Sequence, residues 1–213
     1  MLDHLQQYYL QQMGVELWQL RERDNVRPLK QLALEVASCQ RCPLHKSRTN
    51  VVFARGNPCA DLMIIGEAPG FYEDKQGLPF VGKAGGLLNR MLQGIGLDEQ
   101  SVYIANVLKC RPPDNRDPAA DEIQMCRNYL VEQINLIQPA LILALGRFAG
   151  QFLSGKSLTL HQLRTKIHHY EQIPFIVTYH PAYLLRNPRD KSRAYDDLLK
   201  VKGFLSSREV CPA

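Results

Sequence analysis

The chain has 213 residues, of which 45% are hydrophobic and 22% are charged. This length and composition are typical of one globular domain with a sizeable core, and they exclude a disordered or fibrous chain. The formal net charge of +5 allows a polyanionic partner. Asp3, His4 and Gln6 exclude a signal sequence, and the longest apolar run, residues 140–145, is too short to cross a bilayer. We therefore expect a cytoplasmic or nucleoid-associated protein with no membrane partner.

Residues 1–28 are expected to form a helical extension ahead of a domain at 29–213. Apolar residues at helical spacing are interrupted by Gly14, which predicts two short helical pieces. Pro28 ends a charged stretch and marks the boundary. We interpret the extension as a helix packed on the domain surface, with a docking segment for a protein partner as the alternative. We expect the chain to be a monomer.

Four short apolar runs predict buried strands, at residues 62–65, 102–105, 140–145 and 175–178. Segments between and after them carry apolar residues at helical spacing, and helices are expected at residues 29–37, at 87–95, from Asp117-Pro118 to Ile137, and at 192–207. Apolar strands that alternate with helices indicate a parallel sheet covered on both faces. We predict an α/β fold, a three-layer α/β/α sandwich around a central four-stranded parallel sheet.

Polar residues follow directly on three of these strands: Glu67, Asn106 and His180. Because the carboxyl ends of parallel strands meet at one edge of a sheet, we expect these side chains to converge on a ligand site. Glu67 lies in the turn sequence Gly66-Glu67-Ala68-Pro69-Gly70. A glycine-rich, loop-like stretch follows at residues 73–86, and it carries an aromatic residue among polar groups.

Four of the six cysteines form a candidate metal site: Cys39 and Cys42 in a CxxC pair, Cys110 just past the second strand, and Cys126 on the buried stripe of the long helix. In a cytosolic chain this usage favours metal binding over disulfides. Four thiolates suit zinc or an iron–sulfur cluster, and the spacing does not choose between them. Alternatively, Cys110 and Cys126 are small buried side chains and the CxxC is a redox pair.

Three stretches resemble motifs of the family 4 uracil-DNA glycosylases. They are GEAPG with ED and GxPFVGxAG at residues 66–85, NxxKCRPPxNRxP at residues 106–118 with Glu122 and Cys126 beyond it, and YHPAYLLR at residues 179–186. The resemblance spans about residues 39–199. It implies base excision repair of single- or double-stranded DNA: uracil is flipped out and its N-glycosidic bond is hydrolysed, leaving an abasic site. It also implies one 4Fe-4S cluster on Cys39, Cys42, Cys110 and Cys126.

The resemblance also implies roles within the base pocket, whose first wall is formed by Gly66, Glu67 and Ala68. Phe80 is suited to stack on uracil, and Asn106 has the donor and acceptor that match uracil O4 and N3–H. His180 is expected to donate to uracil O2 in a neutral or charged form. The carboxylate that positions water is Glu67 or Glu73, because Ala68 occupies the place of an aspartate found in other uracil glycosylases. Gly70 replaces a tyrosine that excludes thymine, so another group, such as Glu73, must do so.

A basic stretch from Arg186 to Arg193, with Lys191 in it, is expected to hold DNA phosphates, and Tyr183, Leu184 or Leu185 to enter the gap left by the flipped base. A solvated helix start is the alternative interpretation of these charges. Two other functions compete with the whole assignment. One is a non-enzymatic DNA-binding module with a four-cysteine zinc site. The other is a glycosylase that stays covalently bound to DNA, but that branch carries a histidine in an insertion where residues 111–118 have none.

Overall fold

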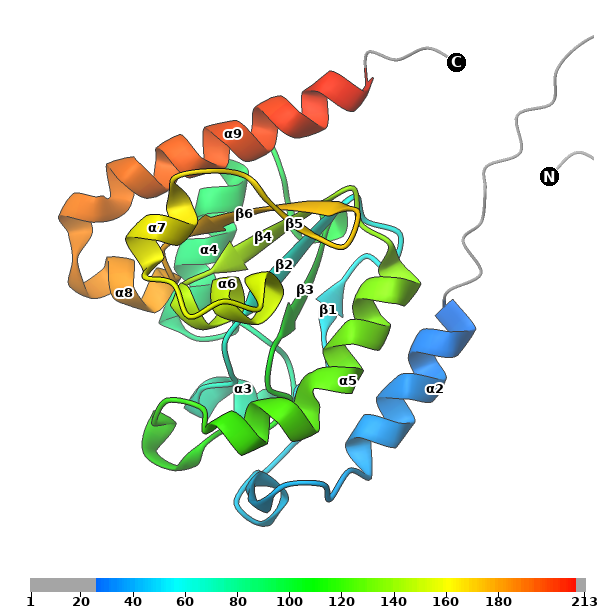
Figure 1. The fold of residues 1–213 in the computed structure, drawn as a ribbon. Helices are drawn as coiled ribbons and strands as arrows, with labels where there is room; N and C mark the ends of the chain where they lie inside the picture. The colour runs from blue at the N-terminus through cyan, green and yellow to red at the C-terminus, as the bar shows by residue number, and fades with distance from the viewer. Residues whose placement is uncertain (1–25, 210–213) are drawn as a thin grey trace, which may run out of the picture.

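The computed structural model describes residues 26–209, so the expected helical pieces before residue 26 lie outside the described part. Its centre is a six-stranded sheet in the order β1-β3-β2-β4-β6-β5 (Figure 1). The strands are β1 (Arg55–Gly56), β2 (Leu62–Gly66), β3 (Val102–Asn106), β4 (Leu141–Leu145), β5 (His168–Tyr170) and β6 (Ile173–Thr178). The four inner strands are parallel, which confirms the predicted central sheet. The short outer strands β1 and β5 are antiparallel additions that the sequence did not suggest.

Helices cover both faces of the sheet. They are α2 (Val26–Ala37), α3 (Phe71–Gln76), α4 (Lys83–Gln93), α5 (Ala120–Ile137), α6 (Arg147–Ser154), α7 (Leu160–Arg164), α8 (Pro181–Arg186) and α9 (Lys191–Glu209). Short 3-10 turns lie at Pro43–Lys46, Glu99–Ser101, Pro113–Asn115 and Pro188–Asp190. Among residues 26–209, no helix combines the length and the apolar character needed to span a membrane.

The two faces of strand β2 show why three layers form. Met63 and Ile65 belong to a core shared with residues of α5 and α6, whereas Leu62 and Ile64 belong to a core shared with residues of α4 and α9. All five residues of the strand are buried, because alternate side chains point to opposite sides of a sheet that is covered on both. Each fully buried aliphatic side chain contributes about 1.5–3 kcal/mol, so this alternation fixes the register of the strand. The predicted α/β/α sandwich is therefore confirmed.

Two local expectations were wrong. Helix α5 begins at Ala120, not at Asp117-Pro118, because the Glu122 carboxylate accepts a hydrogen bond from the Ala119 N–H at 2.9 Å and caps the first turn there. The stretch expected to be a loop at residues 73–86 instead contains most of helix α3 and the start of α4. Helix α3 ends at Gly77, whose φ of 72° is the left-handed conformation that stops a helix.

The connection between α3 and α4 is tightly folded around Phe80. Its φ of 55° is a conformation that non-glycine residues rarely adopt, so the surrounding structure must hold it in place. Gly85, in the first turn of α4, packs directly on its backbone: a Cβ at residue 85 would lie 1.6 Å from the Phe80 carbonyl oxygen. Only glycine allows helix α4 to begin this close to the turn. Gly86, the next residue, has open space around the same position.

This contrast makes a matched pair of substitutions. Gly85→Ala is expected to lower the free energy of unfolding by about 3 kcal/mol, because backbone atoms cannot move away as a flexible side chain would. Gly86→Ala is expected to raise it by about 0.5–1 kcal/mol, since alanine favours the helix and meets no neighbour. Urea denaturation of both variants measures the difference. Equal effects of the two substitutions would show that the Phe80 turn does not depend on Gly85.

Candidate active site

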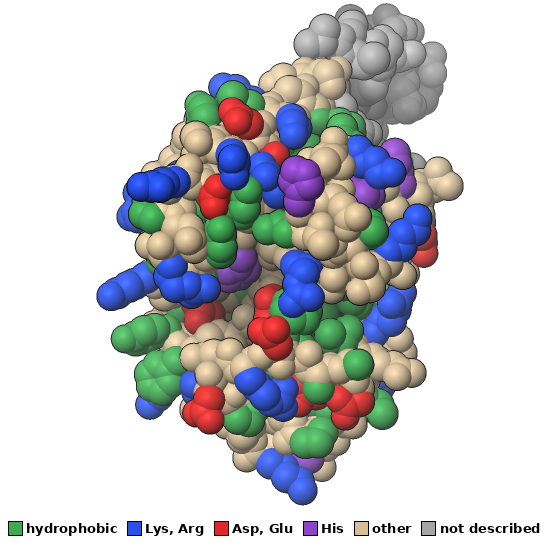
Figure 2. All heavy atoms as spheres, turned by 60° about the vertical axis from the view of Figure 1, so that its left-hand side comes forward, with side chains coloured by type: hydrophobic (Ala, Val, Ile, Leu, Met, Phe, Trp, Pro, Cys, Tyr) green, Lys and Arg blue, Asp and Glu red, His purple; other side chains and the backbone are tan. Residues whose placement is uncertain are grey.

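A cavity of about 640 Å³ opens at the carboxyl edge of the parallel strands. Glu67 and His180, which lie just beyond the ends of β2 and β6, and Asn106, the last residue of β3, all line it, as do Phe80 and Glu73. Figure 2 shows this face of the molecule hollowed at its centre, with acidic and histidine side chains in the hollow and basic and hydrophobic side chains around it. The convergence expected from the strand ends is thus present, and the cavity is large enough for a base with its sugar.

Asn106 presents an unused carbonyl group to this cavity. The residue is only 2% exposed, and its Oδ1 atom is buried without a hydrogen-bond partner among the described residues. A buried acceptor with no partner costs free energy, so this position favours a ligand that donates a hydrogen bond. Gly66 pairs with Asn106 in the sheet, and a Cβ at Gly66 would lie 2.3 Å from that oxygen. The glycine leaves room for the amide to turn toward the cavity.

Phe80 forms an aromatic wall next to the same amide. A Cβ at Gly66 would also lie 2.6 Å from the Phe80 Cζ atom, so this one glycine lets both the ring and the amide approach strand β2. The Phe80 ring lies 5.7 Å from the His180 ring, centroid to centroid, with an angle of 34° between their planes. An aromatic face, an amide and an imidazole therefore meet at one place.

His180 has a defined protonation pattern. Its Nδ1 atom accepts a hydrogen bond from the Ala182 N–H at 3.2 Å, so in the neutral ring the proton is on Nε2. Burial is the main cause that lowers the pKa of His180 to about 4; the positive charge of Arg186 acts in the same direction, and Glu73 opposes both with a smaller effect. The imidazole is therefore neutral at pH 7 and offers its Nε2–H as a donor.

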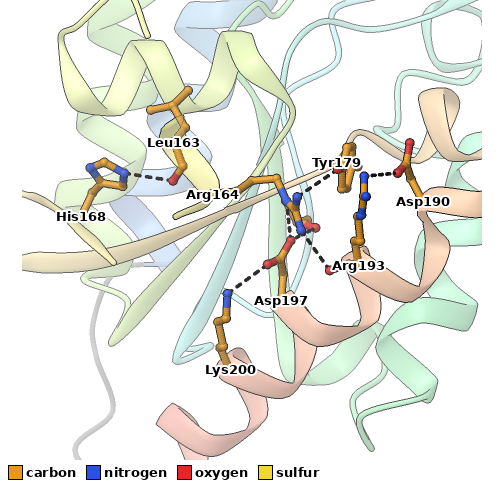
Figure 3. A network of polar contacts seen from close by, with 9 residues as sticks. Leu163, Arg164, His168, Tyr179, Asp190, Arg193, Asp197 and Lys200 are labelled. Carbon is orange, nitrogen blue, oxygen red and sulfur yellow. Dashed lines mark hydrogen bonds and ion pairs between the residues drawn. The ribbon is translucent and has the colours of Figure 1, made fainter. Parts of the chain in front are cut away.

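A polar network behind β6 fixes the strand end that carries His180 (Figure 3). The buried Asp197 carboxylate of α9 accepts hydrogen bonds from Arg164 Nε at 2.8 Å and Thr178 Oγ1 at 2.9 Å, and it pairs with Lys200. Arg164 also donates to the Tyr179 hydroxyl at 2.9 Å, and its guanidinium group lies over the Tyr179 ring. A buried carboxylate with three partners is expensive to disturb, so Tyr179, the neighbour of His180, is held rigidly.

The two candidate carboxylates differ in their surroundings. Glu73 Oε1 accepts hydrogen bonds from the backbone N–H groups of Val81 and Gly82, each at 3.0 Å, and so it holds the turn that carries Phe80. Burial raises the pKa of Glu67 to about 7, assisted by the negative charge of Asp117 and opposed by Arg147. Glu67 is therefore a carboxylate that can exchange a proton near neutral pH.

Of the residues expected to contact DNA, some are accessible in the structure and one is buried. Tyr183 and Arg186 line the cavity, and Lys191 is exposed at the first residue of α9. Leu185 is 40% exposed, but Leu184 is 1% exposed and packs in the core against neighbouring helices. The suggestion that Leu184 enters the DNA was wrong, because on the short helix α8 its side chain points inward.

The four predicted cysteines line one small cavity beside the N-terminal half of α5. Cys39 and Cys42 come from the loop after α2, Cys110 from the loop after β3, and Cys126 from α5. Burial raises the pKa of the Cys126 thiol to about 11, so binding a metal group would have to displace its proton. Arg48 Nη1 donates to Cys110 Sγ at 3.2 Å.

The lining of this cavity defines its possible donor set. Among residues 26–209, no three His, Cys, Asp or Glu side chains gather closely enough to hold a single metal ion. A cluster carries its thiolates farther apart than one ion does, and four cysteine ligands around one cavity are the donor set that it takes. The residues present therefore fit an iron–sulfur cluster by number and type.

Sequence reasoning missed Lys109, Asp117 and Arg147. Lys109 is fully buried, and its Nζ donates to the backbone oxygen of Asn106 at 2.7 Å, which ties the loop between the two sites. Asp117 and Arg147 line the cavity near Glu67 and form an ion pair at 3.8 Å. Arg147 could have been found, because it follows the end of β4 at the same edge as the other three strand ends.

Comparison with known proteins places this fold and site. The family model of the uracil DNA glycosylase superfamily matches residues 53–199, a span that contains the whole sheet and the cavity. The chain belongs to the uracil-DNA glycosylase superfamily.

Similarity to curated relatives narrows the class. The chain is 43% identical over 181 residues to a type-4 uracil-DNA glycosylase of Archaeoglobus fulgidus, covering 81% of this chain and 91% of the relative. It is 44% identical over 188 residues to that of Saccharolobus solfataricus, with 84% and 87% covered, and 43% identical over 174 residues to that of Thermotoga maritima, with 80% and 91% covered. Within the superfamily the chain is a type-4 uracil-DNA glycosylase, an enzyme that removes uracil from DNA in DNA repair.

Proposed function

We propose that this enzyme flips the uracil nucleotide out of DNA into the 640 Å³ cavity, hydrolyses its N-glycosidic bond and leaves an abasic site. The observation that carries the proposal is that Phe80, Asn106, His180 and Glu67 line this one cavity. A base inside a duplex is inaccessible to any such group, so extrusion comes first, at a cost of about a few kcal/mol. Stacking on Phe80 returns about 1–3 kcal/mol of it.

Asn106 is the group that distinguishes uracil from cytosine. Its unpaired Oδ1 accepts the N3–H of uracil, while the amide nitrogen donates to O4. Cytosine has an acceptor at N3 and a donor at the exocyclic nitrogen, the reverse pattern, and would leave these buried groups unpaired. Thymine has the same hydrogen-bonding pattern as uracil and differs by its methyl group. We assign the exclusion of thymine to Glu73. Glu73 Oε2 fills the space beside Gly70, lying 2.7 Å from where a Cβ of that residue would be.

His180 stabilises the leaving base. Cleavage of the N-glycosidic bond places negative charge on uracil O2 and positive charge on the sugar. A neutral imidazole with its proton on Nε2 donates a hydrogen bond to that oxygen without losing the proton, and the preformed donor costs no reorganisation during the reaction.

Glu67 positions the attacking water. Its ionised carboxylate orients the water and offsets positive charge on the sugar. Because burial raises its pKa, the carboxylate can also accept a proton near neutral pH. Glu73 is already bound to two backbone N–H groups, so we assign it a positioning role for the Phe80 turn. We therefore propose Glu67 over Glu73, the alternative that the sequence left open.

The DNA itself is held around the cavity. Arg186 and Lys191 are assigned to phosphates of single- or double-stranded DNA, Tyr183 lines the cavity mouth, and the exposed Leu185 is assigned to the gap left by the flipped base. In this arrangement the basic residues position the strand, and the cavity alone reads the base.

We further propose that Cys39, Cys42, Cys110 and Cys126 hold one 4Fe-4S cluster. When bound, the cluster joins three separate segments of the chain through iron–thiolate bonds. Arg48, whose guanidinium group donates to Cys110 and to the Ala37 carbonyl, tethers one ligand to the end of helix α2. We assign the cluster a structural role, because one of its ligands lies in the loop between Asn106 and helix α5 and another lies in α5 itself.

Substitution of Asn106 tests its proposed role in recognising uracil. Asn106→Ala is expected to reduce uracil release from an oligonucleotide by about a hundredfold or more, since a polar readout partner of the substrate is lost. The control is Asn128→Ala, an exposed asparagine on α5, which should retain wild-type activity. Free uracil is measured by chromatography and folding by thermal denaturation. Full activity in a folded Asn106→Ala variant would exclude Asn106 as the reader.

The pH dependence of the reaction tests Glu67. Because the base acts in its ionised form and its pKa is raised to about 7, kcat/KM should rise with pH through about 7 and then level off. Glu67→Gln should lose this limb and about a hundredfold or more of the rate. If Glu67→Gln shows the same limb as wild type, another group is titrating and the assignment is wrong.

Metal analysis tests the cluster. Protein purified without oxygen should show broad visible absorption and contain iron and inorganic sulfide in equal amounts. Cys126→Ala should lose both, whereas Cys59→Ala, which changes an exposed cysteine outside the cavity, should retain them. A colourless wild-type protein that contains zinc would overturn the proposal.

A further inference from the structure

Two exposed aromatic residues begin helix α3 at the edge of the cavity. Phe71 is 46% exposed and Tyr72 is 58% exposed, and their rings meet edge to face with centroids 5.4 Å apart. Hydrophobic side chains that stand out beside the hollow are visible in Figure 2. Adjacent aromatic rings open to water are unusual unless they bind something. Neither ring has been assigned a role in the reaction.

Two positive charges are held on the Phe71 ring. The Arg111 guanidinium carbon lies 5.2 Å and the Lys75 amine 5.3 Å from its centroid. Arg111 Nε also donates to Asn115 Oδ1 at 2.8 Å, and Asn115 lines the cavity. The pair of cations is thereby fixed between the aromatic residues and the cavity rim, where it would attract an anion.

The Tyr72 ring packs beside segments that lead to the cavity. A Cβ at Gly82 would lie 3.4 Å from the Tyr72 Cδ2 atom, so the ring packs on the segment that follows Phe80. Gly70, which directly precedes helix α3, lines the cavity. A chain that leaves the cavity on this side therefore meets Tyr72 first.

We propose that Phe71, Tyr72, Lys75 and Arg111 form a strand-binding platform that stacks an unpaired base next to the flipped uracil nucleotide. The proposal rests on the proposed function, since it requires DNA in the cavity. Tyr72 offers the ring face for the base, and Phe71 holds the two cations against the strand phosphates. Single-stranded DNA is the occupant that combines free base faces with negative charge. In a duplex the flanking bases keep their faces stacked on each other.

Binding measurements with a strand that cannot be cleaved test the platform. The probe is a fluorescent oligonucleotide with a tetrahydrofuran abasic analogue, used single-stranded and fully paired at one salt concentration. Tyr72→Ala should weaken the Kd for the single strand by about tenfold and change that for the duplex by less than about twofold. Tyr72→Phe, which keeps the ring, should bind like wild type. Leu34→Ala, an exposed apolar residue of helix α2, should change neither Kd nor uracil release.

The outcomes separate this proposal from the proposed function. An unchanged single-strand Kd in Tyr72→Ala overturns the platform and leaves the aromatic pair to a protein partner. Equal losses on both probes also overturn it, because paired bases present no free face. Failure of the proposed function is distinct: the wild-type enzyme would then release no uracil from a uracil-containing strand, whatever the Kd values of the variants.

Discussion

The site depends on a missing side chain at Gly66. Strands β2 and β3 pair there, and the space that a Cβ would occupy is taken by the Asn106 carbonyl oxygen on one side and the Phe80 ring on the other. Any larger residue would separate the amide from the ring. The turn at Phe80, the glycine at the start of α4 and the two hydrogen bonds to Glu73 all serve to keep this close approach.

The fold was predictable because its strands are short, apolar and separated by amphipathic helices. Strand β2 illustrates this, since all of its residues are buried against one of two cores. The edge strands β1 and β5 were not predictable, because they have two and three residues and little apolar pattern. The start of α5 was misplaced for a different reason. Asp117-Pro118 has the chemistry of a helix start, but the side chain of Glu122 caps the helix at Ala119, two residues after Asp117.

The candidate site was predictable where strand ends carried the signal. Glu67, Asn106 and His180 share the cavity because parallel strands end at one edge of the sheet. The sequence could not distinguish Glu67 from Glu73, since the difference lies in backbone hydrogen bonds and burial. Nor could it show that Leu184 points inward while Leu185 points outward, because helix α8 is too short to display a periodic pattern.

The loop from Asn106 to Cys110 contributes residues to both cavities. One of its ends carries the Asn106 amide, which lines the larger cavity, and the other ends in Cys110, which lines the cavity of the four cysteines; between them the ammonium group of Lys109 donates to the carbonyl oxygen of Asn106. This loop is too short to absorb a movement at one end without moving the other. A change in the position of Cys110 would therefore be passed to the Asn106 amide through five consecutive residues and the Lys109 hydrogen bond, so the two cavities are structurally coupled.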